Sequence, residues 1–182
     1  MDHQRPTKGP AARPQRKAAP RRGQAKVVLL VDDDADWRLL VRDALTQAHT
    51  AAQGELEIHE LGDGEEALQF LFRNEQRSSA PLPSLIYLDC EMPRVDGLTM
   101  LTAIRRDERL RDIPTIMLSG LADEGQMRRA YECGASAYIV KPCNAVELSR
   151  VVAASSAYWL RLPINTRAAN NASARKFIGR AA

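Results

Sequence analysis

The 182-residue sequence lacks a long hydrophobic run, is poor in aromatic residues and contains only three cysteines. No apolar segment approaches the roughly 20 residues of a membrane-spanning helix, and the basic N-terminus lacks the apolar segment of a secretory signal. Cys90, Cys133 and Cys143 are odd in number and have no CxxC spacing, which argues against a disulfide framework and against structural zinc. These absences predict a cytoplasmic protein that does not contact a membrane.

Acidic residues are nearly absent from the two ends of the chain. Residues 1–26 hold eight Lys or Arg and one acidic residue. Residues 163–182 hold four Lys or Arg and no acidic residue. Residues 27–162 hold 14 basic and 22 acidic residues, a net charge of −8, so the pI of about 8.9 reflects only the ends. Residues 1–25 are rich in proline and poor in large aliphatic side chains, which predicts a disordered basic tail. A flexible tail is also predicted for 163–182.

Between these ends, two kinds of apolar pattern alternate. Short apolar runs predict strands, and apolar residues spaced three and four apart predict helices. The predicted strands are Val27–Val31, Ile58–Leu61, Leu85–Leu88, Ile113–Leu118 and Ala137–Val140, each followed by a predicted helix. This strict alternation predicts an α/β domain over residues 26–162, with a doubly wound sheet of five parallel strands and five helices.

Several polar residues precede predicted helices in positions typical of helix caps. Asp34 and Asp36 are expected to cap the first helix, Asp63 the second and Asn144 the last, while Asp96 with Gly97 is expected to form a turn. These positions are interpreted as local structure and not as ligands.

Other polar side chains follow the predicted strands directly. Asp32 and Asp33 end the first strand, Asp89 the third, Ser119 the fourth and Lys141 the fifth. Ligands of open α/β sheets bind at this edge. Carboxylates that meet there raise one another's pKa, and an all-oxygen ligand set suits Mg²⁺. A carboxylate beside such a cation can attack phosphorus and form an acyl phosphate, with a lysine and a hydroxyl stabilising the transferred group.

The chain resembles the receiver domain of response regulators over about residues 26–162. The resemblance rests on Val31-Asp32-Asp33, Leu88-Asp89, Met92-Pro93, Asp96-Gly97, Ser119 and Lys141-Pro142, in this order. It implies that Asp89 accepts a phosphoryl group, that Lys141 contacts it, and that Ser119 and Tyr138 are switch residues.

The same resemblance implies a Mg²⁺ site and a backbone feature. The expected ligands are the side chains of Asp32, Asp33 and Asp89 with the backbone carbonyl of Glu91. The peptide bond before Pro142 is expected to be cis.

The resemblance also implies partners. We expect a stand-alone receiver without a DNA-binding domain, phosphorylated by a sensor histidine kinase and acting on a downstream protein target through its fourth helix, fifth strand and fifth helix. The connection Asn74–Pro83 and the helix end Tyr158–Leu160 are similar to those of small receivers that partner bacterial phytochrome kinases and that often form homodimers. Alternatively, Trp159 covers the edge of the core.

Other functions remain open at this point. An aspartate-nucleophile phosphatase would also use an α/β fold, but the separate Asp32-Asp33 pair and the lack of a cap insertion argue against it. The domain could instead be an interaction module that is never phosphorylated, or the basic tails could bind nucleic acid. Cys90 and Cys143 are expected to be small buried residues with no redox role.

Overall fold

The computed structural model describes residues 25–49, 54–73 and 82–161. The predicted tails lie outside these ranges apart from residue 25, as does most of the connection Asn74–Pro83. None of the described helices combines the length and the apolar character needed to cross a membrane.

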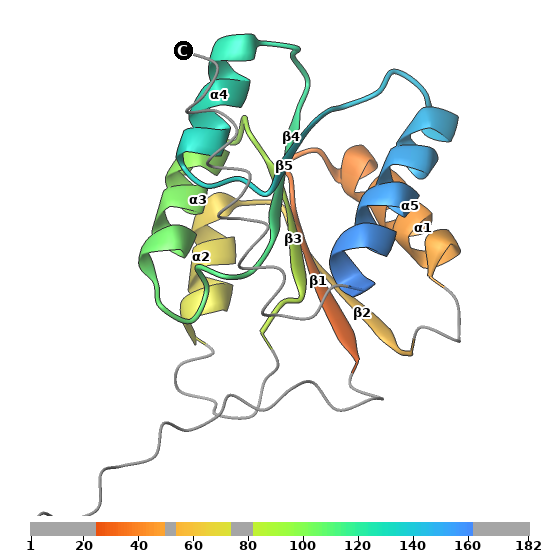
Figure 1. Ribbon diagram of the computed structural model, residues 1–182, viewed down its shortest axis with the longest axis horizontal. Coiled ribbons are helices and arrows are strands. Elements are labelled where there is room, and N and C mark those ends of the chain that lie inside the picture. The colour runs from red at the N-terminus through yellow and green to blue at the C-terminus, as the bar shows by residue number, and fades with distance from the viewer. Residues whose placement is uncertain (1–24, 50–53, 74–81, 162–182) are drawn as a thin grey trace, which may run out of the picture.

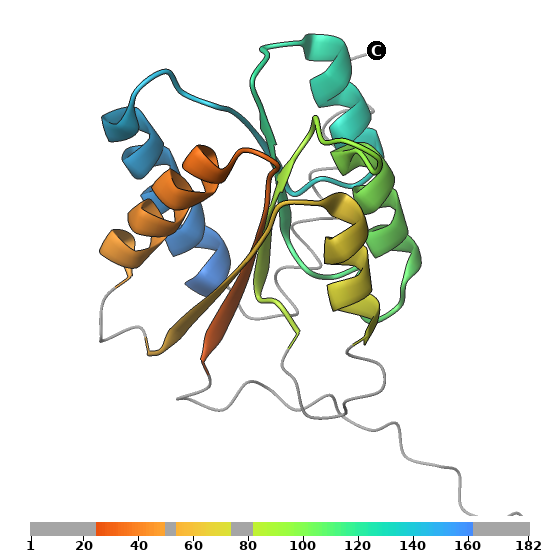
Figure 2. The ribbon, with the colours of Figure 1, turned by 180° about the vertical axis from the view of Figure 1, so that it is seen from behind.

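Five strands and five helices alternate along the described chain, as the sequence predicts. They are β1 (Lys26–Val31), α1 (Ala35–Ala48), β2 (Leu56–Leu61), α2 (Gly64–Arg73), β3 (Leu85–Asp89), α3 (Gly97–Arg106), β4 (Thr115–Ser119), α4 (Glu124–Glu132), β5 (Ala137–Val140) and α5 (Ala145–Arg161). The strands form one parallel sheet in the order β2-β1-β3-β4-β5. Helices α1 and α5 cover one face of this sheet and α2, α3 and α4 cover the other (Figures 1 and 2). The predicted fold class is confirmed.

Each face of the sheet carries its own apolar core. Val28 and Leu30 of β1 belong to the cluster beneath α1 and α5, whereas Leu29 and Val31 belong to the cluster beneath the other three helices. Alternate residues of a strand point to opposite faces, so a strand buried on both faces needs a continuous apolar run. This explains why β1, β3 and β4 are recognisable from sequence.

Most predicted helix caps are present. Asp34 accepts from the backbone N–H groups of Asp36 and Trp37 at the start of α1. Asp63 accepts from the N–H groups of Glu65 and Glu66 in α2, and Asn144 accepts from the N–H of Glu147 in α5. Asp96, which the sequence predicts to form a turn, is instead the cap of α3 and accepts from the N–H of Thr99. The second predicted cap of α1 is wrong, because Asp36 lies inside its first turn. Strand β4 begins later than predicted because Ile113 closes a turn by donating to Leu110 and is followed by Pro114, which has no N–H.

Two further predictions are wrong. The described chain contains no cis peptide bond, so the bond before Pro142 is trans. The trans isomer is favoured before proline by about 0.5–1 kcal/mol, and it is compatible here with a 2.7 Å hydrogen bond from the Lys141 N–H to the Ser119 carbonyl. Cys143 is exposed because it lies in the loop between β5 and α5, whereas Cys90 is buried as expected.

Candidate functional site

The sheet register brings the residues at the carboxyl ends of β1, β3, β4 and β5 to one edge. Val31 pairs with Leu88, so Asp32 and Asp89, the next residues of these neighbouring strands, lie side by side. Asp89 pairs with Leu118, which precedes Ser119, and Ser119 pairs with Val140, which precedes Lys141. Parallel pairing thus assembles residues that are more than 100 positions apart in the chain. This edge includes the point where the strand order reverses, between β1 and β3.

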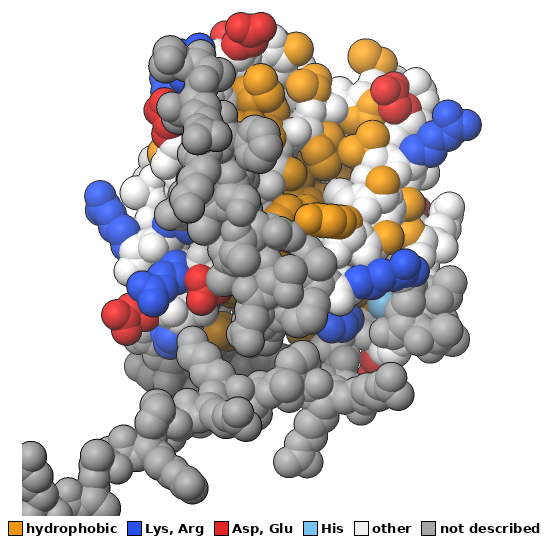
Figure 3. Space-filling view, in the orientation of Figure 1, with side chains coloured by type: hydrophobic (Ala, Val, Ile, Leu, Met, Phe, Trp, Pro, Cys, Tyr) orange, Lys and Arg blue, Asp and Glu red, His pale blue; other side chains and the backbone are white. Residues whose placement is uncertain are grey.

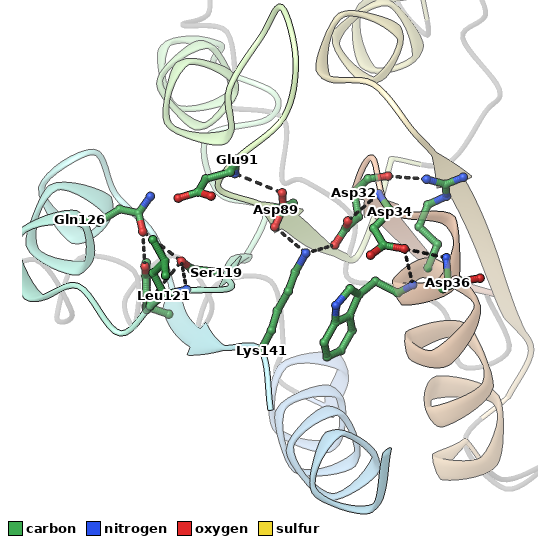
Figure 4. A network of polar contacts seen from close by, with 12 residues as sticks. Asp32, Asp34, Asp36, Asp89, Glu91, Ser119, Leu121, Gln126 and Lys141 are labelled. Atoms are coloured by element: carbon green, nitrogen blue, oxygen red, sulfur yellow. Dashed lines mark hydrogen bonds and ion pairs between the residues drawn. The ribbon is translucent and has the colours of Figure 1, made fainter. Parts of the chain in front are cut away.

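Lys141 joins the two buried carboxylates of the site. Its ammonium nitrogen lies 2.8 Å from Asp32 Oδ2 and 2.8 Å from Asp89 Oδ1 (Figure 4). Asp32 is completely buried and Asp89 is 3% exposed, so these ion pairs are shielded from bulk water. The backbone N–H of Glu91 donates to the other oxygen, Asp89 Oδ2, at 3.1 Å. Both oxygens of Asp89 therefore have a polar neighbour that holds the carboxylate in place.

The pKa values of the groups in this cluster are shifted by burial and by the charges of their neighbours. Burial raises the pKa of Asp89 to about 6 and outweighs the contact with Lys141, and the charge of Asp32 adds to the rise. Burial also raises the pKa of Asp32. Burial alone would lower the pKa of Lys141. The hydrogen bonds from Lys141 to Asp32 and Asp89 outweigh this effect, so the pKa of Lys141 is raised overall. Lys141 is thus a cation near pH 7. The raised pKa values of Asp32 and Asp89 mean that the negative charges of these carboxylates carry a cost, which a second cation would reduce.

Three carboxylates are arranged as a divalent cation would require. Oxygens of Asp32, Asp33 and Asp89 lie within 4.8 Å of one another. Asp32 Oδ2 is buried and accepts no hydrogen bond of good geometry from the described residues. Its charge is balanced by the ion pair with the Lys141 ammonium. Asp33 is exposed, so one side of the cluster opens to solvent. A hard, oxygen-only donor set with room for water fits Mg²⁺.

Ser119 and Tyr138 meet at one acceptor. The Ser119 hydroxyl lies 3.0 Å and the Tyr138 hydroxyl 2.8 Å from the side-chain oxygen of Gln126 in α4. Ser119 is buried, and the partly buried Tyr138 packs against the core beneath α2, α3 and α4. The two predicted switch residues are therefore neighbours, and both contact α4.

Sequence reasoning missed three residues around the site. Arg38 donates to the Asp32 carbonyl at 2.5 Å, the Lys141 ammonium lies 5.4 Å from the ring centroid of Trp37, and Gln126 contacts Ser119 and Tyr138. Trp37 and Arg38 lie in the first turn of α1, which begins two residues after Asp33, so their closeness in sequence to the acidic pair was an available signal. Gln126 had none, because its position depends on how α4 packs.

Comparisons with known proteins agree with this geometry. The family model of the response regulator receiver domain matches residues 28–153. The chain is 34% identical to a probable methanogenesis regulatory protein, FilR2, of Methanothrix harundinacea, over 74% of this chain and 83% of that one. It is 32% identical to the response regulator Rcp1 of Synechocystis, over 74% of this chain and 89% of that one.

Two solved structures have the same fold. The Mn²⁺-bound form of Rcp1 superposes with a TM-score of 0.66 and 30% identity, over 75% of this chain and 95% of that one. The phosphorylated cyanobacterial phytochrome response regulator RcpA superposes with a TM-score of 0.69 and 30% identity, over 76% of this chain and 96% of that one. With its receiver fold, its acidic strand-end cluster and these matches, the chain belongs to the receiver-domain family of two-component response regulators and is related to phytochrome response regulators.

Proposed function

We propose that this protein is a phosphorylation-dependent signalling switch that accepts a phosphoryl group on Asp89 from a sensor histidine kinase. The main support is the position of the Lys141 ammonium, 2.8 Å from both Asp32 and Asp89. A buried lysine in this place balances the carboxylates in the resting state, and it is within reach of a phosphoryl group carried by Asp89.

The chemistry requires few groups. An oxygen of Asp89 attacks phosphorus, an O–P bond forms, and the N–P bond of a phosphohistidine breaks and leaves its electron pair on the imidazole. Asp32, Asp33, Asp89 and the Glu91 carbonyl would hold Mg²⁺, which neutralises charge on the transferred oxygens. Lys141 provides a second positive charge, and burial of Asp89 strengthens both interactions.

We further propose that phosphorylation of Asp89 changes which protein this domain binds. The chain covers 89% of Rcp1, which leaves little of that relative outside the matched region. Hydrophobic side chains gather between α4 and α5 on the face shown in Figure 3. The elements α4, β5 and α5 each carry an exposed large apolar residue, namely Met127, Val140 and Val146. A downstream protein, or a second copy of this chain, would bind this face.

Incubation with Mg²⁺ and acetyl phosphate, followed by intact-mass measurement, tests the proposal. We expect one added phosphoryl group on the wild type and none on Asp89→Asn. EDTA should abolish the labelling. Equal labelling of Asp89→Asn would overturn the assignment, and sustained hydrolysis of a generic phosphate ester would favour a phosphatase. A matched kinase assay would use a phytochrome-type histidine kinase, as the names of the related structures suggest.

A further inference from the structure

The side chain of Gln126 lies between the two switch residues and is held there by the start of its helix. Gln126 is in the first turn of α4, and its backbone N–H donates to the capping carboxylate of Asp123. An N-cap bond of this kind holds the first turn in place. The backbone position of Gln126 is therefore fixed independently of the contacts that its side chain makes.

The hydrogen bonds show why an amide oxygen suits this place. A hydroxyl group has one hydrogen, so Ser119 donates either to Gln126 Oε1, 3.0 Å away, or to the Leu121 carbonyl, 3.1 Å away. It also accepts a bond from the Leu121 N–H at 3.1 Å. An amide oxygen accepts two hydrogen bonds, so Gln126 Oε1 can hold Ser119 and Tyr138 together. Figure 4 shows the Ser119 side chain directed toward Gln126 and Leu121.

We propose that Gln126 is a positioning residue that couples Ser119 to Tyr138 and stabilises the resting arrangement of both. The inference rests on the proposed function, because Ser119 would contact a phosphoryl group on Asp89. To do so its hydroxyl must leave the Gln126 oxygen, which then accepts from Tyr138 alone. Gln126 would then pass movement of Ser119 to α4 and to Tyr138 in β5, in addition to the direct interaction between the Ser119 and Tyr138 side chains.

The first test measures this coupling without phosphate. The protein is labelled with 3-fluorotyrosine, and the fluorine resonance of Tyr138 is assigned by its loss in Tyr138→Phe. We expect Ser119→Ala to move the Tyr138 resonance in the wild-type background and to have little effect in a Gln126→Met background. Met keeps the length of the side chain but has no amide oxygen. Equal displacement in both backgrounds would show that the coupling bypasses Gln126.

The second test measures the stabilisation of the resting state. Mg²⁺ and beryllium fluoride, a phosphoryl analogue, are titrated while the Tyr138 resonance is followed. We expect Gln126→Met to lower the half-saturating concentration about 3- to 10-fold, the effect of one neutral hydrogen bond. Gln126→Glu retains an acceptor and should not tighten binding. If Met and Glu have the same effect, Gln126 only fills space and the inference fails.

Intact-mass labelling with acetyl phosphate separates this inference from the proposed function. If the wild type is labelled on Asp89 but Gln126→Met behaves like the wild type in the first test and like Gln126→Glu in the second, only the inference is wrong. If the wild type is not labelled, the proposed function fails, and the phosphate-free test still decides whether Gln126 couples the two hydroxyl groups. Circular dichroism spectra of each variant check that the fold is intact.

Discussion

The Asp89 carboxyl group links the charge of the site to the stability of the domain. Its pKa in the folded protein is raised to about 6, above the value of 3.8 for an unperturbed aspartate. Between these two values the folded state binds more protons than the unfolded state. The free energy of unfolding therefore falls as pH rises through this window. Above about pH 6 the carboxyl group is ionised in both states, and the loss of stability does not increase further. The raised pKa of Lys141 changes the free energy of unfolding only at alkaline pH, where this group loses its proton.

A first prediction follows for Mg²⁺ and pH. At the proposed site Mg²⁺ would bind the ionised carboxylates, so we expect it to raise the melting temperature more at pH 7.5 than at pH 5. At a concentration 100-fold above its dissociation constant the gain is about 2.7 kcal/mol. Thermal melts with Mg²⁺ and with EDTA measure the difference. Asp89→Asn is the control, because Asn does not titrate and should reduce the gain. A gain that is equal at both pH values would contradict the assignment of the ligands.

A second residue-scale prediction concerns Gly97, the first residue of α3. A Cβ atom on Gly97 would lie 2.0 Å from the Asp89 carbonyl oxygen and 3.0 Å from the Cα of Cys90. These are backbone atoms and cannot rotate away. We expect Gly97→Ala to destabilise the protein by about 1–3 kcal/mol, as overpacked cores do, and to lower labelling by displacing Asp89. Urea denaturation measures the first effect and intact mass the second.

Gly120 provides the matched control for Gly97. It also follows a strand end, but a Cβ atom there would meet nothing within 4 Å. Gly120→Ala should therefore leave the free energy of unfolding nearly unchanged. A similar loss in both variants would mean that crowding at Gly97 is not the cause.

At the scale of elements, the end of α5 settles a choice that the sequence left open. Trp159 is 6% exposed and belongs to the core cluster beneath α1 and α5, whereas Tyr158 is 52% exposed and meets the Trp159 ring edge-on. The interpretation of Trp159 as a cover of the core edge is therefore confirmed. Tyr158 alone of this pair is available to a partner.

The prediction for this element compares the two aromatic residues. We expect Trp159→Ala to cost about 3–5 kcal/mol of stability, as for other buried large aromatics. Tyr158→Ala should cost about 1 kcal/mol or less, the value of an aromatic pair. Chemical denaturation of both variants is the measurement. Comparable losses would mean that Tyr158 contributes to the core more than its exposure indicates.

At the scale of the whole molecule, one sheet serves both cores. Trp37 and Trp159 both lie at the core beneath α1 and α5, and they are the only tryptophans in the sequence. Their fluorescence therefore reports one layer, while far-ultraviolet circular dichroism reports all helices. We expect the two probes to give the same melting midpoint, because neither layer can lose its packing without exposing the shared strands. An earlier fluorescence transition would show that the α1–α5 layer unfolds separately.

The sequence by itself determined the order of elements, the fold class and the residues at the strand ends. Strands buried on both faces need continuous apolar runs, as in Leu85–Leu88, and polar residues directly after them necessarily fall at one edge of a parallel sheet. Asp32, Asp89, Ser119 and Lys141 could be assigned to that edge for this reason.

Only the tertiary structure decided what these residues contact. The approach of Lys141 to both carboxylates depends on strand register, and the meeting of Ser119 and Tyr138 at Gln126 depends on how α4 packs against β4 and β5. The burial of Trp159 but not of Tyr158 depends on the rotation of α5 on the sheet. Local spacing does not encode these features, because they depend on the relative placement of segments that are distant in the chain.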